Sequence, residues 1–261
     1  MILHPAVLAL LTGSVLVVLM VFHAAWWGLK IIDGWDLKSG SESQIILEKK
    51  TYLVSTLMVY AFSFQILSFF LFVHVADELH RLFTGAMCAA GTLNVNGYGY
   101  PTVLLKVLNC ILAGLWLILN YTDSRARDYP LIRKKYSLLM LIAPLIGAEA
   151  YNQGVYFINL KANVITSCCG SLFSTEEEGV GAGLAALPAV TIQAAFFGVM
   201  ALTIASGALF LLRRRFGKLF AVSGTLALPV SAAALISFIS VYFYELPTHH
   251  CPFCILQSEY H

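Results

Sequence analysis

The sequence predicts an all-α, polytopic transmembrane helix bundle of about six spans. Of the 261 residues, 59% are hydrophobic and only 11% are charged, whereas a soluble domain has roughly a quarter charged residues. Six apolar stretches are also long enough to cross about 30 Å of hydrocarbon, which takes roughly 20 helical residues. They run near residues 5–29, 52–75, 102–121, 136–151, 187–212 and 219–244.

The composition also limits the number of domains and the kinds of partner. One helical bundle accounts for nearly the whole chain, so we expect a single domain over residues 1–261. The first apolar stretch has no basic segment before it and no small-residue cleavage site after it, which indicates a retained helix. The net charge of +2 is too small to indicate nucleic-acid binding. The expected surroundings are therefore a lipid bilayer.

Basic residues are concentrated in alternate connections between the expected spans. Thirteen of the sixteen lysines and arginines follow the first, third and fifth spans. Cytoplasmic connections of membrane proteins carry such an excess. We therefore expect the N-terminus, the loops at 76–101 and 152–186, and the C-terminal end to lie outside the cytoplasm. In a bacterial inner membrane this would be the periplasmic side.

All cysteines outside the expected spans are predicted to lie on that outer side. An oxidising outer compartment permits disulfides, so thiol or disulfide chemistry is expected at this face of the membrane. The five residues are Cys88, Cys168, Cys169, Cys251 and Cys254.

The most informative motif follows the sixth expected span. It reads His249-His250-Cys251-Pro252-Phe253-Cys254. A Cys-x-x-Cys pair is a redox couple or half of a metal site, and the thiolate is the reactive form in both. Because imidazolium groups favour a thiolate, Cys251 is the expected nucleophile and Cys254 the resolving thiol. Redox chemistry, metal ligation and a structural disulfide all stay open for this pair.

A second cysteine pair, Cys168 and Cys169, lies in the expected outer loop at 152–186. Vicinal cysteines bond to each other only with strain, so separate partners are expected. They could exchange with Cys251 and Cys254 through a mixed disulfide. Two static disulfides, one of them to Cys88, are the alternative. In either case, Cys168 or Cys169 should lie within disulfide reach of another outer cysteine.

Histidines near the outer ends of the spans indicate a binding site as another possibility. His4 together with His74 or His80 could supply the axial ligands of a b-type haem. A copper or zinc ion would instead suit a second donor set. That set is His249, His250, Cys251, Cys254 and His261.

Glu149 is a carboxylate near the outer end of the fourth expected span, where it is costly unless paired or neutral. It is a candidate proton acceptor beside the thiol site. The alternative, which we favour, is an interfacial glutamate that is hydrogen-bonded to Tyr151 or Asn152. Lys106 is a basic residue inside the third expected span. The other polar residues within spans are Gln65, Asn109, Asn120 and Gln193.

The outer Cys-x-x-Cys at 251–254, together with a second outer pair at 168–169, resembles the DsbB and vitamin K epoxide reductase class of membrane thiol oxidoreductases. In that class a pair at the membrane edge passes electrons to a quinone, and a loop pair shuttles them from a soluble thiol protein. The resemblance implies the first role for Cys251 and Cys254 and the second for Cys168 and Cys169. The chain departs from the class because six spans precede the Cys-x-x-Cys pair, instead of four or five helices.

The sequence thus predicts an integral membrane protein that exchanges thiols and disulfides at its outer face, coupled to a membrane quinone or another redox partner. Two alternatives stay open. One is a copper-, zinc- or haem-binding subunit of a larger membrane electron-transfer or transport complex. The other is a structural subunit that is stapled by disulfides. A soluble thiol protein on the outer side and membrane-complex subunits are the corresponding partners.

Overall fold

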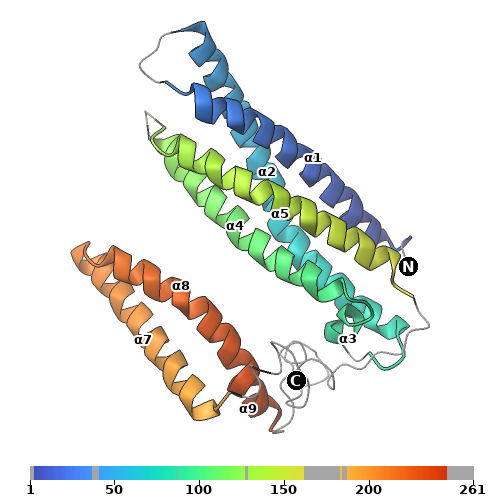
Figure 1. Cartoon of the computed structure of the whole chain (residues 1–261). Helices are drawn as coiled ribbons and strands as arrows, with labels where there is room; N and C mark the ends of the chain where they lie inside the picture. The colour runs from blue at the N-terminus through green and yellow to red at the C-terminus, as the bar shows by residue number, and fades with distance from the viewer. Residues whose placement is uncertain are drawn as a thin grey trace. The chain divides into compact units, whose positions relative to one another are not determined.

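The computed structural model describes residues 3–36, 41–86, 88–126, 129–161, 183 and 187–245. Helices make up most of these residues, and the described part of the chain has no strand (Figure 1). The all-α prediction is confirmed for these residues. Contacts divide the chain into two compact units, residues 1–84 with 92–166 and residues 85–91 with 167–261. The single domain over residues 1–261 stays a prediction.

Four long helices form an antiparallel bundle in the first unit (Figure 1). α1 packs against α2 and α5, and α4 packs against the same two helices, so each helix has two neighbours. The turn η1 (Leu79–Leu82) extends α2, and the short helix α3 (Ala89–Leu93) precedes α4. The long helices are α1 (Pro5–Gly34), α2 (Glu42–Glu78), α4 (Gly99–Arg125) and α5 (Ile132–Ile158).

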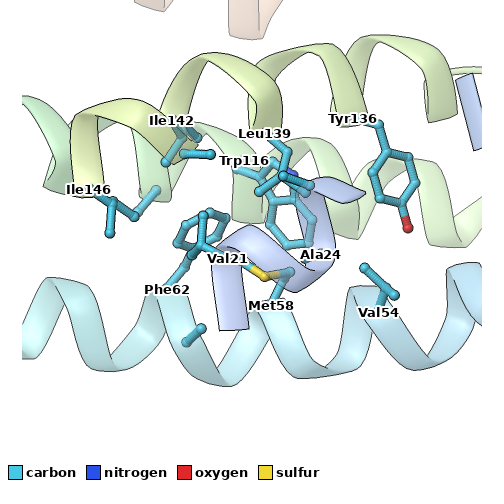
Figure 2. Close-up of a cluster of buried hydrophobic side chains, with 14 of the residues drawn as sticks. Val21, Ala24, Val54, Met58, Phe62, Trp116, Tyr136, Leu139, Ile142 and Ile146 are labelled. Carbon is cyan, nitrogen blue, oxygen red and sulfur yellow. The ribbon is translucent and has the colours of Figure 1, made fainter. Parts of the chain in front are cut away.

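Large apolar side chains fill the middle of this bundle, and all four helices contribute to them (Figure 2). Trp116 of α4 is fully buried and contacts Phe62 of α2 edge-on, with ring centroids 5.1 Å apart. Such a contact stabilises a pair of rings beyond the area that it buries. The other central residues include Val21, Ala24, Met58, Leu139, Ile142 and Ile146.

The second unit contains a helical hairpin. α7 (Ala189–Arg213) and α8 (Gly217–Ala234) are joined by a tight turn in which Arg214 and Phe216 have positive φ. The π-helical segment η2 (Leu235–Ile239) and α9 (Ser240–Tyr244) continue α8. Where the two long helices meet, the hydroxyl oxygens of Ser206 and Ser223 lie 3.2 Å apart and are buried. Small residues of this kind let helix backbones approach closely in membranes.

Five helical segments of the described residues are long and apolar enough to cross a membrane, as expected of an integral membrane protein. They are Pro5–Gly34, Glu42–Leu82, Gly99–Arg125, Ala189–Arg213 and Gly217–Phe243. α5 covers the fourth expected span, 136–151, and is longer than expected. It continues through Pro144, and its polar residues Glu149, Asn152 and Gln153 make it less apolar than the other five.

Candidate functional site

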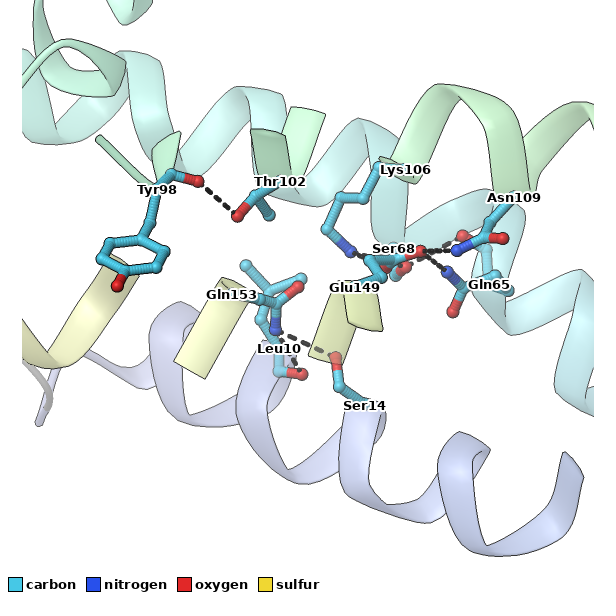
Figure 3. A network of polar contacts seen from close by, with 10 residues as sticks. All are labelled: Leu10, Ser14, Gln65, Ser68, Tyr98, Thr102, Lys106, Asn109, Glu149 and Gln153. Carbon is cyan, nitrogen blue, oxygen red and sulfur yellow. Dashed lines mark hydrogen bonds and ion pairs between the residues drawn. The ribbon is translucent and has the colours of Figure 1, made fainter. Parts of the chain in front are cut away.

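A buried polar site lies where α2, α4 and α5 meet (Figure 3). Glu149 of α5 is only 2% exposed. Its Oε1 accepts a hydrogen bond from Lys106 Nζ at 2.8 Å. Its Oε2 accepts one from Asn109 Nδ2 and one from Gln65 Nε2, both at 2.6 Å. We call Glu149, Lys106, Asn109, Gln65 and Ser68 the Glu149 cluster.

The charges of this cluster balance inside the bundle. Lys106 is 1% exposed, and its Nζ also donates to Ser68 Oγ at 3.4 Å. The same ammonium group lies 5.4 Å from the centroid of the Phe72 ring. Taking either charge out of water alone would cost several kcal/mol, and pairing with hydrogen bonds offsets that penalty. The cluster is therefore a neutral ion pair with hydrogen-bond partners from three further side chains.

One turn further along α5, Gln153 extends the polar contacts to α1 (Figure 3). Its fully buried amide donates to Ser14 Oγ at 2.9 Å and to the main-chain oxygen of Leu10 at 3.2 Å. Glu149 and Gln153 are four residues apart, so they share one face of α5. Polar contacts thus join all four helices near this level of the bundle.

A second buried ion pair lies toward the other end of α4 and α5. Asp123 Oδ2 is 3.1 Å from Lys135 Nζ, and both side chains are almost completely buried. Lys135 Nζ also donates to Ser55 Oγ and to Asn120 Oδ1, both at 3.2 Å. Asp123 Oδ1 accepts the N–H of Leu131, the residue that caps the start of α5, at 2.9 Å. We call Asp123, Lys135, Ser55 and Asn120 the Asp123 cluster.

The two clusters use opposite charges on the same pair of helices. α4 provides Lys106 to one cluster and Asp123 to the other, whereas α5 provides Glu149 and Lys135. Lys106 and Asp123 are roughly 25 Å apart along α4 at the helical rise per residue. Sliding α5 along α4 would break both ion pairs together. The reversed pairs therefore fix the register of these two helices.

Our preferred sequence interpretation of Glu149 is wrong. Tyr151 is 65% exposed, and the Asn152 side chain donates to the main-chain oxygen of Ala148 instead. Glu149 lies on the face of α5 that carries buried Ile142, Ile146 and Gln153, so it points into the bundle. The hydrogen-bond partners of Glu149 are one ammonium group and two amides that do not titrate. The hypothesis that Glu149 accepts a proton stays a prediction.

Sequence reasoning missed the partners of both ion pairs. Lys106 is a charge inside an apolar span, which by itself predicts an opposite charge on a neighbouring helix. Lys135 directly precedes the expected span at 136–151 and so falls in the expected basic connection, but it belongs to α5 and is buried. Asp123 lies near the end of α4, and Lys135 lies near the start of α5. Opposite charges on either side of a short connection between two antiparallel helices are a signal that could have predicted this pair.

The three histidines of the predicted haem site lie at one end of the first unit. His4 caps the start of α1, and its buried Nδ1 has no hydrogen-bond partner among the described residues. His74 lies on an exposed face of α2. His80 lies in η1, where its Nδ1 donates to the main-chain oxygen of Asp77. A haem bound by two of these histidines stays a prediction.

Most residues of the predicted cysteine site lie outside the described residues. These are Cys168, Cys169, His249, His250, Cys251, Cys254 and His261. Cys88 is described, is buried, and directly precedes α3. Within the described ranges, no three His, Cys, Asp or Glu residues are grouped so that they could hold a metal ion. The expected disulfide reach between outer cysteines stays a prediction.

Comparison of the chain with protein-family models, with curated proteins and with solved structures finds no match.

Proposed function

We propose that the protein is an integral membrane thiol–disulfide oxidoreductase whose cysteine site lies on the outer side of the membrane. The observation that carries this proposal is the motif Cys251-Pro252-Phe253-Cys254, which directly follows His249 and His250. A Cys-x-x-Cys pair beside imidazolium groups forms a reactive thiolate readily. In a bacterium, this site would lie on the periplasmic side of the inner membrane.

The helix directions of the first unit support one side for the segments that carry Cys88, Cys168 and Cys169. Cys88 lies between the end of α2 at Glu78 and the start of α4 at Gly99. Cys168 and Cys169 follow the end of α5 at Ile158. Because neighbouring helices are antiparallel, these ends lie together at one end of the bundle (Figure 1). The opposite end carries most of its lysines and arginines and is therefore the cytoplasmic end.

The hairpin of the second unit supports the same placement for the terminal motif. α7 begins at Ala189, after Cys168 and Cys169 in the sequence. α9 ends at Tyr244, before Cys251 in the sequence. Ser237 Oγ donates to the main-chain oxygen of Leu187 at 3.2 Å, so the start of α7 and the end of the second arm adjoin. We count α5 together with the five long apolar helices, which gives six membrane crossings. With this count, the N-terminus and all five loop cysteines lie outside.

The reaction that this arrangement supports moves two electrons through cysteine pairs. A dithiol of a soluble partner reduces the disulfide that Cys168 or Cys169 forms with a second outer cysteine, and it leaves as a disulfide. One of the two shuttle thiolates formed then attacks the Cys251–Cys254 disulfide and displaces one thiolate of that pair. The other shuttle thiolate attacks the resulting mixed disulfide, so the shuttle disulfide forms again and Cys251 and Cys254 are left as a dithiol. Two electrons and two protons leave the reduced pair for a membrane acceptor, and a quinone is the class that the resemblance implies.

The Glu149 cluster supports this chemistry by positioning helices. It lies in the half of the bundle nearer the connections that carry Cys88, Cys168 and Cys169. Its contacts hold α2, α4 and α5 together at that level. We assign it no contact with the reacting thiols.

Single cysteine variants of the full-length protein test the proposal. Purified protein in detergent is mixed with a fluorescent peptide disulfide, and exchange is followed with time. Cys251→Ser should abolish exchange, and Cys254→Ser should accumulate a covalent complex with the peptide. Cys110→Ser, which removes a thiol inside α4, is the matched control and should exchange as the native protein does. Full activity of both motif variants would overturn the proposal.

The same variants separate two other functions from this one. Five donors, His249, His250, Cys251, Cys254 and His261, lie within the last thirteen residues, and this density favours a copper or zinc site. Loss of a bound ion with unchanged exchange would favour this metal-binding subunit. A haem absorption band that depends on His4 would favour the haem alternative. Lower thermal stability alone would favour a disulfide-stapled structural subunit.

A further inference from the structure

Two lysines and two tryptophans gather where α1 ends and α2 begins. The ammonium groups of Lys30 and Lys50 lie 4.7 and 4.9 Å from the centroid of the Trp27 ring. Lys30 also lies 5.4 Å from the centroid of the Trp26 ring, and Trp26 is 62% exposed. We call Lys30, Lys50, Trp26 and Trp27 the lysine–tryptophan cluster. It lies at the basic end of the first unit.

The cluster brings two like charges to one ring. Among the described residues, neither Lys30 nor Lys50 forms an ion pair. A cation over an indole ring is stabilised by the ring, but two ammonium groups that share one ring still repel each other. An anion held between them would remove that repulsion. The cluster therefore has the charge and the aromatic surface of an anion site at a membrane interface.

An apolar groove begins one helical turn from the cluster and follows the seam between α1 and α2. Its first part is a hollow of about 220 Å³ that is lined by Met20, His23, Ala24, Val54 and Leu57, with Leu19 at its edge. Ala24 lies three residues before Trp27, and Val54 lies four residues after Lys50. Each of these pairs is therefore about one turn apart on its helix.

A second hollow of about 220 Å³ shares Met20 with the first in its lining and reaches Gly13 and Phe64. Gly13 lets the ring of Phe64 lie against α1, since a Cβ there would collide with Phe64 Cζ. The distance from Ala24 to Gly13 along α1 is roughly 16 Å. This matches one leaflet of a hydrocarbon core that is about 30 Å thick. The groove thus has the length of an acyl chain in one leaflet.

We propose that this surface binds one anionic phospholipid. Its phosphate lies between Lys30 and Lys50 at the Trp27 ring, and one acyl chain lies in the groove along α1 and α2. Charge complementarity selects an anionic headgroup, and the length of the groove selects a long chain. Basic pockets between transmembrane helices on the cytoplasmic side bind anionic headgroups in this way. This site contains no cysteine, so it does not depend on the proposed thiol chemistry.

Lipid binding to the full-length protein in detergent tests the headgroup contact. Phosphatidylglycerol and phosphatidylcholine with identical chains are titrated separately, and bound lipid is counted by native mass spectrometry. The native protein should bind phosphatidylglycerol more tightly. Lys30→Gln with Lys50→Gln should weaken that binding roughly thirty-fold, because each interfacial lysine contributes about a factor of five. Equal binding of the two lipids by the native protein would overturn the proposal.

A matched pair of lysines controls for net charge. Lys49→Gln with Lys134→Gln removes the same charge from the same end of the bundle, but neither residue contacts Trp27. This variant should bind phosphatidylglycerol within about two-fold of the native protein, since it keeps both cluster lysines. Loss as large as that of the cluster variant would show attraction by net charge alone and would overturn the site.

A bulky side chain tests the groove. Leu57→Trp adds a ring to the first hollow without changing any charge. It should weaken binding of long-chain phosphatidylglycerol at least several-fold and leave binding of glycerophosphoglycerol, the same lipid without its chains, unchanged. Unchanged long-chain binding in a variant of native helix content would place the acyl chain elsewhere and overturn this part of the proposal.

Discussion

The Glu149 cluster and the Asp123 cluster each contain one ion pair between α4 and α5, with the two charges exchanged between the helices, yet their surroundings differ. Glu149 receives all its hydrogen bonds from side chains, and these come from α2 and α4. Asp123 receives a backbone N–H from Leu131, and its partner Lys135 lines a cavity of about 390 Å³. One cluster is sealed among helices, and the other borders a hollow next to a helix connection.

This difference predicts how each cluster responds to the loss of a charge. A buried ion that loses its partner must be resolvated, and the penalty depends on whether water can reach it. The cavity beside Lys135 has polar side chains in its lining, among them Ser55, Asn120 and Thr51, which can bind water. Lys106 lies instead against Ser68 and Phe72. The sealed pair should therefore be the more sensitive of the two.

Glu149→Gln should have the largest effect. The change keeps the shape of the side chain but leaves the Lys106 ammonium group buried without its counter-charge. The free energy of unfolding should fall by about 3–5 kcal/mol, the usual range for breaking a buried pair. Denaturation with sodium dodecyl sulfate in mixed micelles, followed by circular dichroism, measures it.

Removing both charges of the pair is the control for that variant. Lys106→Met with Glu149→Met should recover most of the lost stability, because apolar replacement of a whole buried ion pair is often close to neutral. If the double variant were as unstable as Glu149→Gln, hydrogen bonding and packing, and not charge balance, would set the cost.

Asp123→Asn should have a smaller effect, about 1–3 kcal/mol. Asparagine keeps an oxygen for the N–H of Leu131, and water in the adjoining cavity can solvate Lys135. The same detergent titration measures it. A loss equal to that of Glu149→Gln would remove the contrast between a sealed and a hydrated pair.

Asp123→Ala isolates the backbone contact when it is compared with Asp123→Asn. Alanine cannot accept the N–H of Leu131 at the start of α5, so it should cost about 1 kcal/mol more than asparagine, the usual effect of losing a helix cap. Equal stabilities of the two variants would mean that this contact contributes nothing to the Asp123 cluster.

Ser206→Ala in the second unit should have the smallest effect and gives the neutral reference for both clusters. It removes the buried hydroxyl contact with Ser223 between α7 and α8. Hydrogen bonds between membrane helices contribute about 0.6 kcal/mol on average. Thr225→Ala, an exposed hydroxyl that bonds its own helix, is the control and should have no measurable effect. A loss above that of Asp123→Asn would contradict the ranking by charge.

The sequence was sufficient for the helices and insufficient for the contacts between them. Apolar length predicted six spans, and a long helix lies near each of the six positions, because the membrane requirement depends on local composition. Five of these helices are apolar enough to cross a membrane, and a sixth crossing by α5 stays a prediction. Apolar length left open which face of α5 is buried, so Glu149 was assigned to the interface. A charge at the boundary of a span is exposed or buried according to the neighbouring helix, so the sequence alone does not show that Lys135 is buried in α5. Only the packing of α4 against α5 supplies Asp123 and Lys106 as partners.

Labelling of the native cysteines in intact bacterial cells tests the oxidoreductase proposal most directly. The protein carries Cys88→Ser and Cys110→Ser, so only the two predicted pairs can react. A membrane-impermeant maleimide is added with and without mild reduction, and modified residues are mapped by mass spectrometry. Modification of Cys251 or Cys254 should occur without permeabilisation and increase after reduction. Modification only after the inner membrane is lysed, or to the same extent without reductant, would contradict an outer, reversibly oxidised cysteine pair.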